Sequence, residues 1–199
     1  MRSLLKERRG RNMRIRFTYV LIALLIAVFA VELAFPQIID ELAFSPASVA
    51  AKPWTAVTAI FAHADFEHIL ANLVVLWFFG LAVERELGGK KTALIFFVGA
   101  FIGEIASLVL YAPDVLSLGA SGGIFALIGA AIFVQPFMEM TAWQGASTMP
   151  LIFLAVIYIV YNTIGLFAGP SDIAYGTHFA GLAVGLVIGA WWRKQARRK

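Results

Sequence analysis

The sequence predicts an all-α, polytopic membrane protein whose six transmembrane helices form one bundle and a single domain. Of its 199 residues 61% are hydrophobic and 14% are charged, whereas soluble domains are about 45 to 50% apolar and about 25% charged. The mean hydropathy is accordingly high, at +0.84. Six separate apolar runs, each about long enough to cross a bilayer, complete the prediction.

The predicted helices follow from these runs, taken in order along the chain. Their expected ranges are 17–35, 66–83, 92–111, 121–138, 149–168 and 174–192. No clear small-residue cleavage site follows the first run, so we interpret it as a retained span rather than a secretory signal. The long connection from Pro36 to Asp65 is expected to lie in the membrane interface. Gly88-Gly89 end the second helix, and Pro150 is expected in the first turn of the fifth.

The distribution of positive charge predicts the orientation. All but one of the 16 lysines and arginines lie in the two tails or between the second and third helices, and Lys52 alone lies on the other side. By the positive-inside rule both termini are cytosolic. The predicted parts are a basic tail at 1–16, a six-helix domain at 17–192 and a basic tail at 193–199. We interpret the tails as topology determinants with affinity for anionic lipid, not as a nucleic-acid site.

Four polar residues inside these helices need an explanation, because polar groups are costly in hydrocarbon. They are His68, Asn72, Ser121 and His178. Three of them are followed, at the end of the same predicted helix, by a charged residue that we expect at the cytosolic boundary. At a helix rise of about 1.5 Å per residue, the distance along the helix from each of the three to its charged residue is roughly 22 to 27 Å. These pairs are His68 with Glu84, Ser121 with Glu139, and His178 with Arg193. We therefore expect the three side chains at one depth, slightly below the outer surface of the hydrocarbon.

The chemistry open to these residues is acyl transfer. Ser121 lies between glycines at the amino end of an apolar helix, where negative charge is stabilised. A serine becomes nucleophilic when a base removes its proton, and His178 suits that task. His68 and Asn72 share a helix face and could both donate to the oxyanion, with the backbone N–H of Ser121 as a third donor. Such a reaction needs no metal and no organic cofactor, and the absence of cysteine excludes a thiolate nucleophile.

Small residues recur every four positions on the fourth and sixth helices. They are Gly122, Ala126 and Ala130 on the fourth, and Gly181, Gly185 and Gly189 on the sixth. Such stripes let two helices approach closely, which would keep base and nucleophile within reach. Taken alone, each feature has a structural alternative: glycines for packing, a capping serine, a helix contact for His68 with Asn72, or a proton-relay or metal role for His178. The joint pattern of spacing, order and depth favours the catalytic interpretation.

Three motifs stand in order along the chain. They are His63-x4-His68-x3-Asn72, Gly119-Ala120-Ser121-Gly122, and a last-helix histidine followed by Gly181 and Gly185. Together they resemble the rhomboid family of intramembrane serine proteases, and Glu84-Arg85 with Gly88 matches the family's charged pair at the inner end of the second helix. The resemblance covers nearly the whole chain, from the first span to the sixth.

The resemblance implies a shortened fourth helix that begins in mid-membrane and a water-filled cavity open to the outside. By position it makes Ser121 the nucleophile and His178 the base, with His68 and Asn72 in the oxyanion hole. Phe125 lies where the family often has an aromatic ring stacked on the base. The implied substrates are single-span or multi-span membrane proteins, cut within or beside a helix in the lipid bilayer.

The chain departs from the family pattern in its first external loop, where Trp54-Thr55 replaces the common Trp-Arg. No carboxylate is obviously placed to orient His178, since Asp172 lies six residues earlier in the last external loop. A dyad is therefore the expected arrangement. For Glu32 and Glu104, which match no motif, we expect a hydrogen bond to a neighbouring helix or to cavity water.

Two other classes of function stay open. One is a catalytically inactive rhomboid-like protein that binds membrane helices. The other is a transporter or proton channel using His68, His178, Glu104 and Glu32, although no internal repeat supports it. The expected location is a prokaryotic cell membrane, with the site opening on the extracytoplasmic side. The sequence leaves open the substrate, the oligomeric state and the gate, for which the fifth helix and the loop from Gly169 to Tyr175 are candidates.

Overall fold

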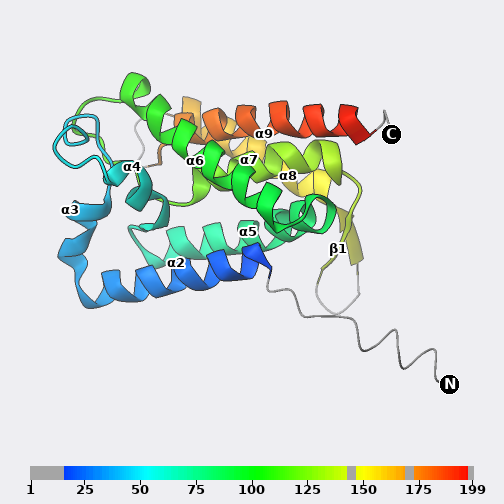
Figure 1. The fold of residues 1–199 in the computed structure, drawn as a ribbon, viewed down its shortest axis with the longest axis horizontal. Coiled ribbons are helices and arrows are strands. Elements are labelled where there is room, and N and C mark those ends of the chain that lie inside the picture. Colours follow the sequence, from blue (N-terminus) through cyan, green and yellow to red (C-terminus); the bar gives the residue numbers. More distant parts are fainter. Residues whose placement is uncertain (1–15, 143–146, 169–172, 197–199) are drawn as a thin grey trace.

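The computed structural model describes residues 16–142, 147–168 and 173–196, and most of these residues are helical (Figure 1). The long helices are α2 (Phe17–Ala34), α5 (Phe66–Leu87), α6 (Gly89–Leu110), α7 (Ser121–Val134), α8 (Leu151–Phe167) and α9 (Tyr175–Ala196). Among the described residues, α2, α5 and α6 are long and apolar enough to cross a membrane, and α7 and α8 are shorter apolar helices. The predicted helical membrane fold is confirmed. The count of six spans and the cytosolic position of both termini stay predictions, and residues 1–15 and 197–199 of the basic tails lie outside the described residues.

A side chain from another helix caps the amino end of α2. The carboxylate of Glu84, near the end of α5, accepts from the backbone N–H groups of Phe17 at 2.7 Å and Thr18 at 2.9 Å, and from the Thr18 hydroxyl at 2.7 Å. The first N–H groups of a helix have no partner within the helix, and an anion at that end is favoured by the helix dipole. Toward the other end of α2, buried Glu32 accepts from the backbone N–H of His63 at 3.2 Å. The two glutamates therefore fasten α2 to α5 and to the segment before it.

The connection between α2 and α5 is folded into short helices at one end of the bundle (Figure 1). These are η1 (Pro36–Ile38), α3 (Ile39–Leu42), α4 (Thr55–Thr58) and η2 (Ala59–Phe61). Trp54 Nε1 donates to the carbonyl of Glu41 at 3.0 Å, and Lys52 pairs with the Glu41 carboxylate at 2.9 Å. Thr55, which stands where the family commonly has arginine, is buried and donates to the carbonyl of Lys52 at 2.7 Å. Contacts within the loop therefore anchor it without that arginine.

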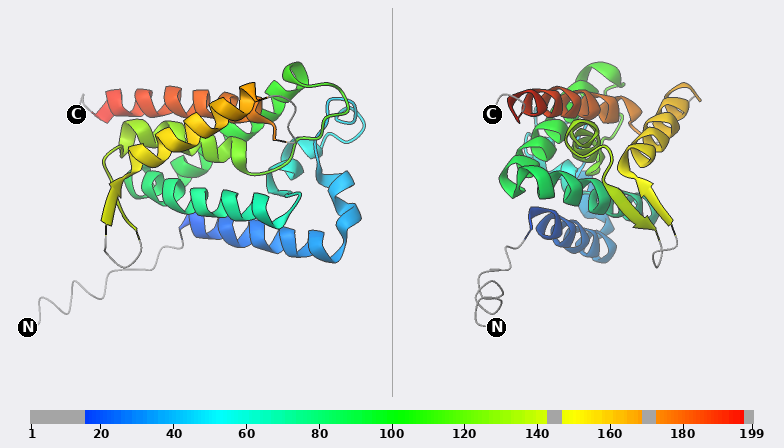
Figure 2. Two further views of the ribbon diagram at one scale, coloured as in Figure 1. Left: turned by 180° about the vertical axis from the view of Figure 1, so that it is seen from behind. Right: turned by 90° about the vertical axis from the view of Figure 1, so that its right-hand side faces the viewer.

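Helix α7 lies at the centre of the bundle, and Figure 2 shows it nearly end-on in its right-hand view. Every residue from Gly122 to Ala131 is buried. The helix ends at Val134, four residues earlier than predicted, and Pro136 follows because a proline cannot continue the hydrogen-bonded helix. The depth of Ser121 was therefore estimated over a helix that is too long, since Glu139 belongs to a strand.

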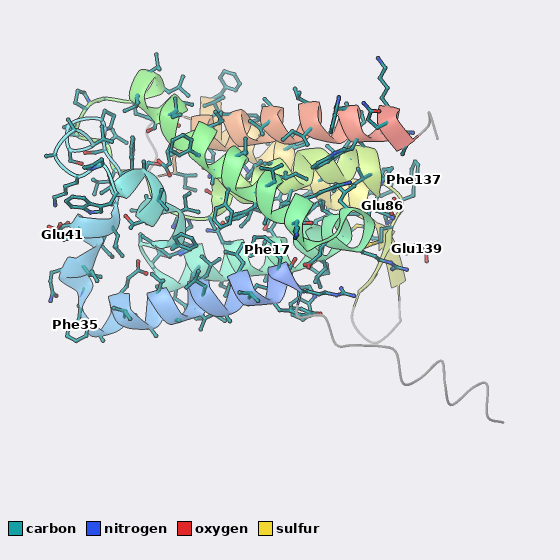
Figure 3. All side chains as sticks on the ribbon, in the orientation of Figure 1. Phe17, Phe35, Glu41, Glu86, Phe137 and Glu139 are labelled. Atoms are coloured by element: carbon teal, nitrogen blue, oxygen red, sulfur yellow. The ribbon has the colours of Figure 1, made fainter. Side chains whose placement is uncertain are left out.

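A hairpin that the sequence analysis did not predict connects α7 to α8. Strand β1 (Glu139–Ala142) pairs antiparallel with β2 (Ser147–Pro150), so that Glu139 lies opposite Pro150. Pro150 is the residue before α8 rather than part of its first turn, which corrects that prediction. Figure 3 shows Glu139 and Glu86 at the end of the bundle opposite Phe35 and Glu41.

Helices α7 and α9 approach each other along their small residues. A Cβ atom added to Gly181 would collide with the carbonyl oxygen of Gly122, and one added to Gly185 would collide with that of Ala126. One turn further, a Cβ on Gly189 would lie 2.8 Å from the Cα of Ala130. The two stripes thus face each other in register. This contact brings the start of α7 beside the first turns of α9.

Candidate active site

A cavity of about 450 Å³ lies between α5, α6, α7, α8 and α9. Its lining includes all four of the polar residues that the sequence analysis singled out. They are His68 and Asn72 of α5, Ser121 of α7 and His178 of α9. Phe125 and Gly122 line the same cavity. The fold therefore brings together residues that lie up to 110 positions apart in the chain.

The segment leading to Ser121 is fixed by hydrogen bonds to the connection between α2 and α5. Ser117 and Phe44 exchange two backbone hydrogen bonds of 2.7 and 2.9 Å, and the N–H of Gly119 donates to the carbonyl of Ala59 at 2.8 Å. Gly119 has a φ of +116°, and a Cβ there would lie 2.7 Å from His68 Nε2. Glycine is required at this position both for its backbone conformation and for its contact with the histidine. These contacts set where α7 begins, and hence where the Ser121 hydroxyl lies.

The imidazole of His178 is held by aromatic rings and by one hydrogen bond. The ring of Phe125 stacks on it, with centroids 4.7 Å apart and planes inclined by 9°, and Tyr175 meets it edge-on at 6.1 Å. His178 Nδ1 lies 2.6 Å from the amide oxygen of Asn162 in α8. The sequence analysis missed Asn162 because it looked only for a carboxylate. A single amide in an otherwise apolar span is the signal that could have found it.

His68 and Asn72 occupy the first turns of α5, where the predicted start of the helix is well capped. The carboxylate of Asp65 accepts from the backbone N–H of His68 at 2.7 Å. Asn72 Nδ2 donates to the carbonyl of His68 at 3.1 Å, which leaves its second amide hydrogen for another acceptor. Both side chains lie against Gly119, two residues before Ser121. They are therefore placed beside the amino end of α7, where negative charge would be stabilised.

His63, the first histidine of the motif, lies in the segment before α5 and is fully buried. Its ring meets that of His68 edge-on, with centroids 5.0 Å apart, and its Nδ1 lies 3.1 Å from the carbonyl of Phe61. Burial lowers the pKa of His63 to about 4, and the charge of His68 acts in the same direction. His63 is therefore neutral at pH 7, with Nδ1 donating to the carbonyl.

Two further acidic residues were considered for roles in the site. Glu104 of α6 lines the cavity, and its Oε2 is buried with no hydrogen-bond partner in the part of the chain that is described. Asp172 and the rest of the segment 169–172 lie outside the described residues, so a contribution of this loop to the site stays a prediction. Within the described ranges, no group of three or more histidines, cysteines, aspartates or glutamates is arranged to hold a metal.

Residues 50–195 match the family model of the rhomboid domain. The chain is 32% identical to YdcA of Bacillus subtilis over 135 residues, which are 68% of this chain and 65% of YdcA. It is 31% identical to the rhomboid protease GluP of the same organism over 137 residues, 69% of this chain and 25% of GluP. It is 29% identical to RHOMBOID-like protein 4 of Arabidopsis thaliana over 136 residues, which are 68% of this chain and 33% of that protein. The chain thus spans between 25% and 65% of the length of these relatives. Because the family model covers more than half of it, the chain belongs to the rhomboid family and is an integral membrane protein.

Proposed function

We propose that this protein is an intramembrane serine endopeptidase of the rhomboid type. It hydrolyses a peptide bond of another membrane protein, within or beside a transmembrane helix of that substrate. The observation that carries the proposal is the single cavity lined by Ser121, at the amino end of α7, and by His178 of α9. A relative named as a rhomboid protease, GluP, supports it.

In the proposed reaction the Ser121 oxygen attacks the scissile carbonyl carbon while Nε2 of His178 takes the hydroxyl proton. The imidazolium then donates this proton to the departing amine, and the peptide C–N bond breaks to leave an acyl ester on Ser121. Water, deprotonated by the same nitrogen, hydrolyses the ester. Phe125 and Tyr175 keep the imidazole in place through both steps.

The tetrahedral intermediate carries a negative oxygen that fixed donors must stabilise. We assign this task to the free amide hydrogen of Asn72, to the ring of His68 and to the backbone N–H of Ser121. The first two lie beside Gly119, and the third belongs to the unpaired N–H groups at the amino end of α7. All three therefore come from the same corner of the cavity.

The orientation and the extent of the enzyme belong to the same proposal. The protease domain spans residues 17–192, flanked by basic tails at 1–16 and 193–199. Lys52 lies in the external loop, and the described cations near the opposite end of the bundle are Arg16, Arg85, Lys90, Lys91, Arg193 and Lys194. By the positive-inside rule the cavity opens on the extracytoplasmic side, in a prokaryotic cell membrane. The substrate segment must leave its helix to expose the scissile carbonyl, which helix-breaking residues near the cut would ease.

The test is incubation of the detergent-purified protein with a tagged single-span substrate, followed by mass spectrometry of the fragments. We expect cleavage by the unmodified protein and none by Ser121→Ala or His178→Ala. Ser107→Ala, which changes a buried serine of α6 that does not line the cavity, is the matched control and should cleave normally. Cleavage that persists in Ser121→Ala would refute the assignment of the nucleophile.

A fluorophosphonate probe distinguishes an inactive protein from an active one that was given a substrate it does not cleave. Labelling of Ser121 without cleavage would show that Ser121 is reactive and that the tested protein is not a substrate. Failure of both cleavage and labelling, with stable binding of the substrate, would instead support a catalytically inactive rhomboid-like protein that binds membrane helices.

A further inference from the structure

Asn162 is a buried amide on a helix that is otherwise poorly covered. It is 3% exposed, and the other buried residues of α8 are Leu151 and Ala155. An amide in hydrocarbon is costly unless each of its polar atoms finds a partner. The side chain of Asn162 also lines the cavity that holds Ser121 and His178. Its two hydrogen bonds therefore show what the amide does there.

The first bond fixes the orientation of the amide. Asn162 Nδ2 donates to the carbonyl of Tyr158, one turn earlier on α8, at 2.8 Å. A reversed amide would place its oxygen against that carbonyl oxygen, with no hydrogen between them. The amide oxygen must consequently face the other way, toward α9.

The second bond fixes the tautomer of the histidine. The Asn162 oxygen lies 2.6 Å from His178 Nδ1 and can only accept a hydrogen, so Nδ1 must be the nitrogen that carries it. In a neutral imidazole the remaining nitrogen, Nε2, then has the free lone pair. That nitrogen is the one that the proposed reaction uses as its base.

A second contact between the same two helices keeps this bond in register. Gly165, three residues after Asn162 on α8, faces Tyr175, three residues before His178 on α9, and a Cβ on Gly165 would collide with the tyrosine ring. Two contacts, Asn162 with His178 and Gly165 with Tyr175, thus join the antiparallel helices α8 and α9, and they are three residues apart on each helix. Tyr175 in turn stands edge-on to the His178 ring. The contact brings α8 close enough for its amide to reach the imidazole.

We propose that Asn162 is the positioning residue of the catalytic base, holding His178 in the Nδ1-protonated tautomer through its amide oxygen. This inference rests on the proposed protease function and adds to the dyad a third residue, supplied by α8. A neutral amide orients the imidazole without placing a carboxylate in the membrane interior, where a buried charge is expensive. It thereby does what an aspartate does in soluble serine hydrolases, namely select one tautomer and one ring orientation.

The first readout needs no turnover. The chain contains three histidines, so nitrogen-15 labelling of histidine gives three imidazole spin systems, and the one lost in His178→Gln is assigned to His178. We expect the chemical shifts of the protein to show a protonated Nδ1 and a bare Nε2. In Asn162→Leu, which keeps the branched shape of the side chain and removes the acceptor, this preference should disappear. Thr163→Val, an exposed neighbour on α8, is the matched control and should leave the spectrum unchanged.

The second readout is the split between kcat and KM with a cleaved substrate. Asn162→Leu should lower kcat by about 100-fold with little change in KM, because the base is misoriented while the cavity keeps its shape. Asn162→Asp should restore much of the rate. Whether ionised or neutral, a carboxyl group offers an oxygen to Nδ1, and its neutral form can also donate to the Tyr158 carbonyl.

The outcomes separate the two proposals. A folded Asn162→Leu protein with unchanged kcat, or with the His178 tautomer of the unmodified protein, would overturn the role of Asn162 and leave the protease proposal intact. Hydrolysis by the unmodified protein that does not depend on Ser121 would overturn the protease proposal. The tautomer measurement would then still show whether Asn162 orients the imidazole.

Discussion

Helix α7 brings Ser121 to the cavity and α8 brings Asn162, yet the two helices are packed in opposite ways. In α7 every residue from Gly122 to Ala131 is buried, and glycines of α9 press against its backbone. In α8 the buried residues are Leu151, Ala155 and Asn162, and large apolar side chains such as Phe153 and Ile157 are exposed. One helix is enclosed on all sides, whereas the other touches the bundle along a narrow strip.

The difference shows which side chains give this bundle its rigidity. Large apolar residues do not hold α8 in place, because lipid tails solvate them as well as protein does. Small residues hold α7, because they allow backbone to approach backbone and maximise dispersion contacts. The proposed nucleophile therefore lies on the most constrained helix, and the residue proposed to orient the base lies on a less constrained one. Four predictions, from the largest expected effect to the smallest, test this contrast.

The largest effect is expected from Gly185→Val in α9. A Cβ at this position would collide with the Ala126 carbonyl oxygen, so a branched side chain must force α7 and α9 apart. We expect the free energy of unfolding to fall by at least about 3 kcal/mol, and cleavage to be lost. Unfolding in mixed detergent micelles with increasing dodecyl sulfate measures the first effect. Val187→Leu, at an exposed position on the same helix, is the control and should unfold like the unmodified protein. An unchanged unfolding midpoint for Gly185→Val would mean that α7 and α9 are not in contact there.

An effect of similar size is expected from pH at His63, which is as fully enclosed as the residues of α7. The pKa of His63 is lowered to about 4 by burial, from an ordinary value of 6.5. Between these values the unfolded chain binds a proton that the folded protein does not, so stability is full above pH 6.5 and falls as the pH drops toward 4. The expected loss is up to about 3 kcal/mol.

Comparison with His63→Gln isolates this contribution from that of the carboxylates, which titrate in the same range. The glutamine amide can still donate to the Phe61 carbonyl, which accepts from His63 in the unmodified protein. The unmodified protein should lose more stability than the variant between pH 7 and pH 4. Equal losses in the two proteins would show that His63 binds a proton as readily in the folded protein as in the unfolded chain.

A smaller effect on stability, with a clear effect on activity, is expected from Gly165→Ala in α8. The added methyl group must displace the ring of Tyr175, which stands edge-on to His178. Because α8 is loosely packed, it can shift outward, and we expect a loss of about 1 kcal/mol in stability. Moving the base should lower kcat by about tenfold. Phe167→Leu, at an exposed position two residues later, is the control. Equal kcat values for Gly165→Ala and the unmodified protein would show that Tyr175 does not hold the base.

The smallest effect is expected from Ile157→Ala, on the outward face of α8. Ile157 is 56% exposed, so its side chain meets lipid in both the folded and the loosened bundle. The change in unfolding free energy should stay within about 0.5 kcal/mol, with normal cleavage. Ala155→Leu, at a buried position on the same helix, provides the contrast and should destabilise. A loss above about 2 kcal/mol for Ile157→Ala would reveal that this face packs against another protein surface.

Apolar runs and small-residue spacing predicted much of what the structure shows. The helices α2 and α5 begin at Phe17 and Phe66 as predicted, because each follows a clear change in polarity. The apolar run stops at 83, but α5 continues through the charged residues to Leu87 and ends at Gly88, one of the two glycines predicted to end it. Gly88, with a φ of +80°, is what ends the helix.

The features that escaped prediction depend on contacts between distant residues. Strand β1 sets Glu139 opposite Pro150 of β2, whereas a hydropathy profile shows only that the apolar run of α7 has ended. Glu84 was matched to a family pair with no assigned partner, because its contacts lie 66 and 67 positions away. Asn162 meets His178 only when α8 and α9 fold against each other. Spacing along one helix is readable in a sequence, whereas the choice of partner on another helix is not.

The cap that α5 provides for α2 has a consequence for the order of synthesis. The amino end of α2 leaves the ribosome first, but the carboxylate that satisfies its N–H groups is translated 66 residues later. Until then water must solvate that end of α2 at the membrane surface. Docking of the first span is therefore a late event, which waits for translation of α5 to be completed.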